Sequence, residues 1–303
     1  MSMRLMSTTI SVRMVDMANH QVSPDNQVSV RILRPFKAGI PNLGQYFQDM
    51  KNRKAFVLEL SRAERNVEHL DTFFGQMWSV LSPLLSAGVY YLFIFVVQGG
   101  HQGPEFFLHL MAGIFIFEFV STAGTRGANS ITRAGALINN TSFPRALLPL
   151  TDVLTAFRVF IPAMFIYAIF HFALGVPLHP AALQAIPAFI LILMFASGLA
   201  MFVAAAQVYF RDTQALLPFM LRLTMFLSPV LYFPEQAKAL LDGRILTIFN
   251  PIFCQVQIFS GSLVRGDTFD IWTWLIAISW ALFTFIGGFW FLVTREGEFA
   301  ARI

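Results

Sequence analysis

The sequence predicts an all-α integral membrane protein with six transmembrane helices. An amphipathic interface helix precedes them, and a re-entrant helix pair lies between spans five and six. Of the 303 residues, 56% are hydrophobic and only 13% are charged, whereas soluble domains carry about 25% charge. A soluble domain of this size needs a polar exterior, which so apolar a chain cannot supply. Two further observations support a membrane protein: long apolar runs follow residue 72, and basic residues gather before it.

Residues 1–54 form a polar N-terminal arm that we expect in the cytoplasm. Ten of the 21 Lys and Arg residues fall within residues 1–72, and no apolar run suited to a secretory signal occurs in the first fifty residues. The basic residues do not interleave with aromatic ones, which disfavours a nucleic-acid partner. The single cysteine, Cys254, excludes a disulfide framework within the chain and a cysteine-rich metal site.

Residues 55–72 are predicted to form an amphipathic helix. Apolar residues recur there at intervals of three and four, which places them on one helix face: Phe56, Leu60, Ala63, Val67, Leu70. Such a helix beside a membrane lies in the plane of the interface. The alternative is a soluble helix packed on its own domain, but too little chain precedes it to form one.

Residues 73–303 are predicted to be a six-span transmembrane domain. A span needs about 20 mostly apolar residues. Six segments meet this requirement, although the second contains Glu118 and the fifth contains Arg222 and two prolines. The predicted spans are 73–97, 106–124, 153–177, 184–210, 215–233 and 271–294.

The distribution of charge orients these spans. With six crossings, both termini and the loop 125–152 lie on one side, which then collects 18 of the 21 basic residues. The opposite side holds only Lys238, Arg244 and Arg265. Because loops rich in Lys and Arg remain inside, both termini are expected in the cytoplasm.

The segment between the fifth and sixth spans is too apolar for a solvated loop and too interrupted for a span. It begins with Ser228–Pro234 and returns through Ile245–Ile258, which contains Asn250-Pro251. A re-entrant pair of short helices fits this pattern, because irregular backbone at membrane depth is tolerated where protein covers it. The alternative is an external lid with a hydrophobic underside.

Motifs for catalysis are absent from the sequence. It contains no P-loop for ATP, no zinc-protease motif and no nucleophile elbow. We therefore expect no enzymatic activity, no metal and no cofactor in this chain. Glu118, Arg158 and Arg222 fall within spans; they either snorkel or pair with one another, or they line an inner vestibule for a polar or charged headgroup.

Several motifs together resemble the permease subunits of type-2 ABC transporters that export polysaccharides such as O-antigen, teichoic acid and cell-wall galactan. The resemblance covers about residues 55–300. It starts with Phe74-Gly75-Gln76-Met77-Trp78 and Ser82-Pro83 and continues with Gly113. The other matching motifs are Asn139–Arg145, Tyr209-Phe210-Arg211-Asp212, Ser228-Pro229-Val230-Leu231-Tyr232 and Asn250-Pro251.

The resemblance implies a homodimeric pore in the bacterial inner membrane, with an ATPase subunit bound to each protomer. ATP and Mg²⁺ would bind to that partner subunit. The substrate would be a lipid-linked polysaccharide that is taken up from the cytoplasmic leaflet. Alternatives are a type-2 exporter of a drug or lipid, a stand-alone channel or secondary carrier, and a membrane-embedded glycosyl- or acyltransferase.

Three groups of candidate site residues follow from the resemblance and the predicted topology. The candidate substrate path combines aromatic residues, which stack on sugars, with charged ones: Phe73, Phe74, Trp78, Glu118, Arg222, Phe226 and Tyr232. The candidate ATPase contacts are Arg62, Arg65, Asn139, Asn140, Phe143, Pro144, Arg145, Arg211 and Asp212. The candidate outer gate consists of Ser228, Pro229, Asn250 and Pro251.

Overall fold

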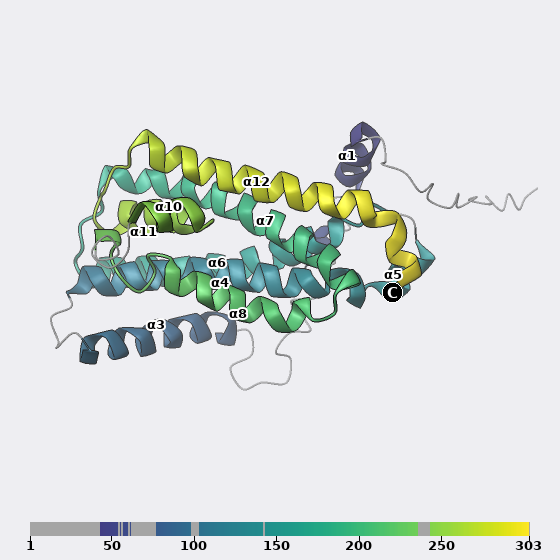
Figure 1. Ribbon diagram of the computed structural model, residues 1–303. Helices are drawn as coiled ribbons and strands as arrows, with labels where there is room; N and C mark the ends of the chain where they lie inside the picture. Colours follow the sequence, from purple (N-terminus) through teal and green to yellow (C-terminus); the bar gives the residue numbers. More distant parts are fainter. Residues whose placement is uncertain are drawn as a thin grey trace, which may run out of the picture. The chain divides into compact units, whose positions relative to one another are not determined.

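The chain is all-helical in the parts that its computed structural model describes, which are residues 43–53, 55, 57–59, 61, 77–97, 103–141, 143–235 and 243–302 (Figure 1). This confirms the predicted all-α class. Most of the predicted arm 1–54 and of the interface helix 55–72 lies outside the described residues. The helices are α1 (Leu43–Asn52), α3 (Trp78–Val97), α4 (Pro104–Arg133), α5 (Gly135–Asn140), α6 (Leu147–Ala173), η2 (Pro180–Gln184), α7 (Ala185–Tyr209), α8 (Thr213–Leu227), α10 (Gly243–Phe249), α11 (Phe253–Val264), α12 (Ile271–Arg295), η3 (Glu296–Glu298) and α13 (Phe299–Arg302).

Four helical segments among the described residues are long and apolar enough to cross a membrane. They are Pro104–Arg133, Leu147–Ala173, Pro180–Tyr209 and Ile271–Glu298, and they correspond to the second, third, fourth and sixth predicted spans. The first and fifth predicted spans correspond to α3 and α8, whose apolar stretches Leu81–Val97 and Thr213–Leu227 are shorter.

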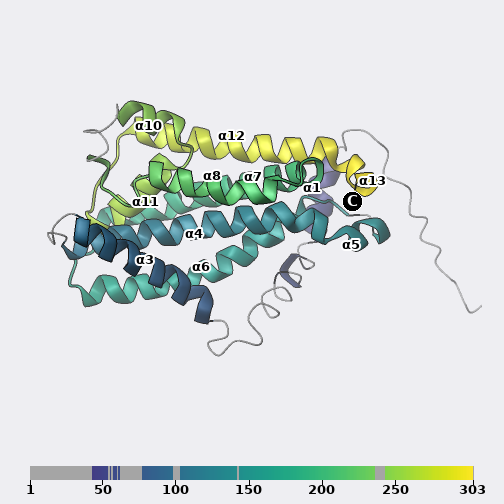
Figure 2. The same ribbon diagram turned by 60° about the horizontal axis from the view of Figure 1, so that its bottom comes forward.

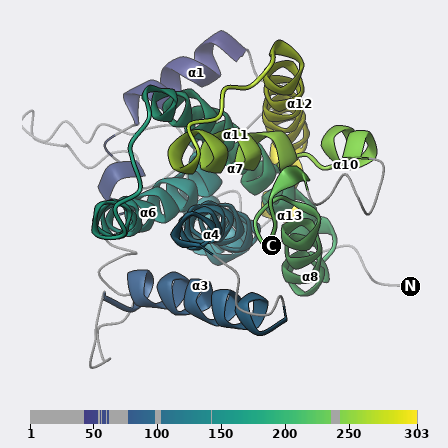
Figure 3. The same ribbon diagram turned by 90° about the vertical axis from the view of Figure 1, so that its left-hand side faces the viewer.

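The long helices lie side by side, with α4, α7 and α12 running in one direction and α6 running in the other. Here α4 packs on α6 and α7, and α12 packs on α7. Figures 1 and 2 show α5 and α13 at one end of the bundle and α10 and α11 at the other. We call these the C-terminal end and the α11 end. Figure 3 shows α4 in the middle of the bundle, with α3 and α8 on two sides of it.

Small residues allow α4 and α7 to approach closely. Ala196, Ala200 and Ala204 of α7 have no exposed surface. A Cβ atom on Gly127 of α4 would lie only 2.7 Å from the Cβ of Ala200. Any side chain at Gly127 would therefore separate the two helices, which is the usual role of small residues at helix contacts in membranes.

The prediction of a loop over residues 125–152 is wrong at both of its ends. Helix α4 continues to Arg133, and α6 already begins at Leu147. Polar residues between Ser121 and Thr132 made this stretch look like a loop. They alternate with buried Gly124, Gly127, Ala128 and Ile131, so that the helix keeps one apolar face for packing.

Candidate functional site

The four predicted gate residues come together at the α11 end. Helix α8 ends at Leu227 and is followed by Ser228, whose hydroxyl donates to the Thr224 carbonyl at 2.7 Å. The Asn250 amide donates to the Ser228 hydroxyl oxygen at 3.0 Å, and its own oxygen accepts from the Ile252 backbone N–H at 3.2 Å. Asn250 therefore joins the end of α8 to the start of α11. Pro229 is buried in this junction, and Pro251 is half-buried.

We expect Asn250→Ala to loosen this junction by about 1–3 kcal/mol, because it leaves the buried Ser228 hydroxyl and Ile252 N–H without these partners. Hydrogen exchange at Ile252–Val256 in the purified protein should then accelerate. Ser228→Ala is the matched control, because it removes the bond to Ser228 but keeps the bond to Ile252. Exchange that is faster in Ser228→Ala than in Asn250→Ala would contradict this assignment.

The chain beyond Ser228 covers the α11 end of α4. Val230 is fully buried, and a Cβ on Gly113 of α4 would lie 3.1 Å from its Cγ1. His109 of α4 donates from Nε2 to the Tyr232 carbonyl at 3.2 Å. The Phe233 ring packs edge-on against Phe106 at 5.5 Å between ring centres.

Contacts of a charged side chain, Arg265, also hold the segment that follows Ser228 in place. The Arg265 guanidinium lies 4.8 Å from the centre of the Phe233 ring and makes ion pairs with Glu235 at 3.1 Å and with Asp267 at 2.5 Å. Arg265 is one of the three basic residues expected on the external side, and the sequence indicates no role for it. The contact depends on Glu235, thirty residues away in the chain, so no local sequence pattern reveals it.

The predicted path residues are only partly brought together. Arg222 and Phe226 lie one turn apart on α8 and are both exposed, whereas Glu118 lies on α4. The Tyr232 hydroxyl donates to the Leu227 carbonyl at 2.9 Å and so caps α8. Trp78 is half-buried at the start of α3, and Phe73 and Phe74 lie outside the described residues.

The pairing that we considered for the ionisable residues within spans is wrong. Glu118 hydrogen-bonds Thr122, one turn further along α4. Arg158 donates to the Ser61 hydroxyl at 2.6 Å. Neither contact joins Glu118 to an arginine of a neighbouring helix. Glu118 and Arg158 therefore each have another hydrogen-bond partner, which for Arg158 lies 97 residues away in the chain.

A buried carboxylate organises the C-terminal end of the bundle. Glu296 accepts hydrogen bonds from the Tyr46 hydroxyl at 2.7 Å and from the Arg145 backbone N–H at 2.8 Å, and its carbonyl accepts from the Arg145 guanidinium. The Tyr46 oxygen in turn accepts from the Ala146 N–H at 3.3 Å. This Glu296 cluster joins α1, the segment before α6 and the tail after α12.

The surroundings of the cluster shift the pKa of two of its members, Tyr46 and Arg145. Burial, reinforced by the Glu296 carboxylate, raises the pKa of the Tyr46 hydroxyl, so that it remains a donor. Burial lowers the pKa of the Arg145 guanidinium, but an arginine stays charged at neutral pH. Phe143 and Pro144 are buried beside the cluster. Of these three residues, only Arg145 was a candidate from the sequence, whereas Tyr46 and Glu296 were not. The signals present in the sequence were a basic residue before the predicted span 153–177 and an acid after the predicted span 271–294.

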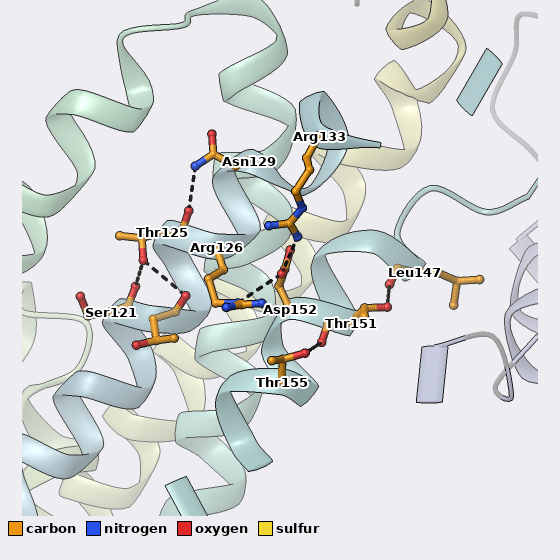
Figure 4. A network of polar contacts seen from close by, with 10 residues as sticks. Ser121, Thr125, Arg126, Asn129, Arg133, Leu147, Thr151, Asp152 and Thr155 are labelled. Carbon is orange, nitrogen blue, oxygen red and sulfur yellow. Dashed lines mark hydrogen bonds and ion pairs between the residues drawn. The ribbon is translucent and has the colours of Figure 1, made fainter. Parts of the chain in front are cut away.

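A second polar network joins α4 to α6 near the same end (Figure 4). The Asp152 carboxylate, which is 1% exposed, lies 2.9 Å from the Arg133 guanidinium and 3.5 Å from Nε of Arg126. Thr151 and Thr155 bond to carbonyls of their own helix at 2.8 and 2.9 Å. Sequence analysis placed this stretch in a loop and did not identify the network.

The remaining predicted contacts lie at or near the C-terminal end. Arg211 and Asp212 are exposed in the turn between α7 and α8, where the Gln214 N–H donates to the Gln207 side chain at 2.8 Å. Asn139 and Asn140 belong to α5, but their side chains lie outside the described residues, as do Arg62 and Arg65. The described candidates therefore surround the end where α4, α7 and α12 terminate.

Comparison with known proteins confirms the resemblance seen in the motifs. The chain is 26% identical over 226 residues to the O-antigen export system permease protein RfbA of Klebsiella pneumoniae, which covers 74% of this chain and 83% of the relative. A second Klebsiella pneumoniae protein of that name is 25% identical over the same shares. The RfbA protein of Myxococcus xanthus is 28% identical over 187 residues, which cover 61% of this chain and 71% of the relative. No protein-family profile matches the chain.

Proposed function

We propose that this chain is the transmembrane subunit of an ATP-driven exporter that moves a lipid-linked polysaccharide across the bacterial inner membrane. The observation that carries the proposal is its similarity to O-antigen export permeases over three quarters of its length. An ABC export system requires an ATPase partner. ATP and Mg²⁺ would bind to that separate subunit, since this chain contains no P-loop sequence.

The C-terminal end of the bundle is the proposed contact for the ATPase. Phe143, Pro144, Arg145, Arg211 and Asp212 belong to connections at this end, and Glu296 ties one of these connections to the tail. A displacement of the Arg145 segment by a bound ATPase would therefore also move α1 and the end of α12. In this topology both termini lie in the cytoplasm, as the charge distribution favours.

The opposite end supports an outer gate. With α3 and α8 counted as crossings, the chain has six spans, and α10 and α11 form a re-entrant pair around Asn250-Pro251. The contact of Val230 with Gly113 and the Asn250–Ser228 bond hold this segment closed over α4. Opening would require that both contacts separate.

The pore itself is proposed to form between two copies of the chain. Helix α8 leaves Phe219, Leu223 and Phe226 exposed, and α3 leaves Leu92 and Phe93 exposed. Some of these side chains would face the second copy or the pore, and others the lipid. Rings that face the pore could stack on the sugars of a passing polysaccharide.

A test in cells separates this function from its rivals. Deletion of the chain should abolish the surface polysaccharide while its lipid-linked form accumulates on the cytoplasmic side. Inactivation of the partner ATPase should give the same phenotype. Unchanged surface polysaccharide after deletion would overturn the proposal, and transport by the chain without its ATPase would favour a channel or secondary carrier.

The gate assignment gives a separate prediction. Gly113→Leu inserts a side chain where even a Cβ is 3.1 Å from Val230, so it should displace the external segment and make vesicles that contain the transporter leaky to small solutes. Gly88→Leu on α3 is the matched control, because no atom lies within 4 Å of a Cβ at that position. Equal leakage in the two variants would contradict the gate.

A further inference from the structure

Most of helix α4 has an unusual surface. Between Leu108 and Thr132, most residues are buried, and every side chain that reaches the surface is polar or charged. The accessible residues are Glu118, Ser121, Thr122, Thr125, Arg126, Asn129 and Thr132. The apolar residues of this stretch are all buried, so no apolar side chain interrupts the accessible surface.

All of these except Arg126 lie on one face. Their spacing of three, one, three, four and three residues follows the turn of an α-helix, and we call the six residues from Glu118 to Thr132 the polar stripe. It extends for about 21 Å at a rise of about 1.5 Å per residue. Figure 4 shows Ser121, Thr125 and Asn129 along one side of α4, whereas Arg126 and Arg133 reach toward Asp152.

The neighbouring helices explain where the stripe is accessible. Near the α11 end, α3 covers this face of α4, since Tyr91 packs edge-on against Phe107 at 5.1 Å between ring centres. Pro83 of α3 borders the same narrow crevice as Glu118 and Thr122. The stripe runs from beside Pro83 toward the C-terminal end of the bundle, where α4 ends.

The stripe presents hydrogen-bond acceptors. The Thr125 hydroxyl donates to the Ser121 carbonyl at 2.8 Å, and the Thr132 hydroxyl to the Asn129 carbonyl at 3.1 Å. The Asn129 amide donates to the Thr125 carbonyl at 3.4 Å. With these hydrogens used inside the helix, the outward lone pairs of the oxygens can accept from another molecule.

Lipid is a poor neighbour for such a surface. Hydroxyl groups alone could face acyl chains, because their donors are satisfied by the helix. The acid of Glu118, which bonds to Thr122, and the amide of Asn129 need more partners than their own helix supplies, since burial of such groups in hydrocarbon costs several kcal/mol. Water or a molecule rich in hydroxyl groups satisfies every member of the stripe.

We infer that the polar stripe of α4 lines a water-filled path on which the hydroxyl groups of a saccharide chain bind as donors. This inference rests on the proposed function and assigns the path to residues that the aromatic pattern did not indicate. The path ends beyond Glu118, because every residue from Leu108 to Phe117 is buried and Val230 covers Gly113. The structure therefore has the path closed toward the α11 end.

Thiol accessibility tests the water-filled path directly. Cys254 is the single cysteine and is buried, so a Cys254→Ala background leaves only introduced thiols. In the assembled transporter in membrane vesicles, Ser121→Cys, Thr125→Cys and Asn129→Cys should react with a charged, membrane-impermeant thiol reagent at least ten-fold faster than Phe165→Cys or Ala128→Cys. Phe165 is 69% exposed on the outside of α6, and Ala128 is fully buried.

Saccharide binding is tested by removing one acceptor. Thr125→Val should lower the rate of glycan export about five-fold, as expected for one hydrogen bond of about 1 kcal/mol, with an unchanged amount of assembled complex. Thr155→Val removes a hydroxyl with the same bond to its own helix, but at a buried position of α6, and should not change export.

The two experiments distinguish the possible failures. Stripe thiols that react as slowly as Phe165→Cys would overturn the inference, and they would mean that lipid or a second copy covers the stripe, even if export itself is observed. Rapid labelling with equal export in both threonine variants would overturn the saccharide contact. A chain that exports no glycan at all would overturn the proposed function, whereas labelling would still report the water-filled path.

Discussion

Replacement of Asp152 by asparagine is expected to destabilise the protein by about 3 kcal/mol. Removal of one partner of a buried ion pair costs about 3–5 kcal/mol, because it leaves an uncompensated charge. Here Arg126 would be left with a side chain that is only 18% exposed, whereas Arg133, with 48% exposed, can turn toward solvent. The lower end of the range is therefore expected, measured as the free energy of unfolding of the purified protein in detergent.

Arg133→Gln is the matched control for this change. It removes the closer arginine but keeps the Arg126–Asp152 pair, and exposed ion pairs contribute only about 0–1 kcal/mol. The cost should therefore stay near 1 kcal/mol. A larger loss for Arg133→Gln than for Asp152→Asn would show that the exposed arginine, and not the buried carboxylate, organises the α4–α6 contact.

Glu296→Ala should release α1 from the C-terminal end. The change removes the acceptor of the Tyr46 hydroxyl and of the Arg145 N–H, both in the Glu296 cluster. Buried polar groups that lose their partners each cost about 1–3 kcal/mol, so a total of about 3 kcal/mol is expected. Hydrogen exchange over Leu43–Asn52 should accelerate more than exchange in α7.

The neighbouring acid provides the control for this variant. Glu298 is exposed and accepts from the Tyr209 hydroxyl at 2.7 Å, with Arg302 at 3.4 Å. Glu298→Ala should leave hydrogen exchange in α1 unchanged, because this acid lies on the surface and bonds to Tyr209 and Arg302 rather than to Tyr46. Faster α1 exchange in Glu298→Ala, or unchanged exchange in Glu296→Ala, would contradict the role of the Glu296 cluster.

The fold was predictable where composition dominates. Apolar runs alone indicate α6, α7 and α12, because a run of about 20 apolar residues is typical of a membrane-spanning helix. The second span was underestimated by nine residues at its C-terminal end, since α4 reaches Arg133. When hydropathy is averaged along the sequence, the polar residues of this stretch make it look like a loop. Only their 3.6-residue period shows that they share one face of a continuing helix.

The site was predictable where motifs are local and not where contacts are distant. Ser228-Pro229 and Asn250-Pro251 were identified from the motifs, and the structure joins them through a bond between residues 22 positions apart. The contact between Tyr46 and Glu296 spans 250 positions, and no single-sequence pattern connects residues so far apart. Aromatic residues were predicted to form the path, but Tyr232 is used to cap α8.

The most direct test of the central claim is reconstitution of the chain with its ATPase subunit in proteoliposomes that contain the lipid-linked polysaccharide. Appearance of the glycan on the opposite side of the membrane is followed with a glycosidase that acts only there. The account predicts glycan transfer that requires ATP, this chain and an intact ATPase. Equal transfer without ATP, or ATP hydrolysis without any glycan transfer, would contradict it.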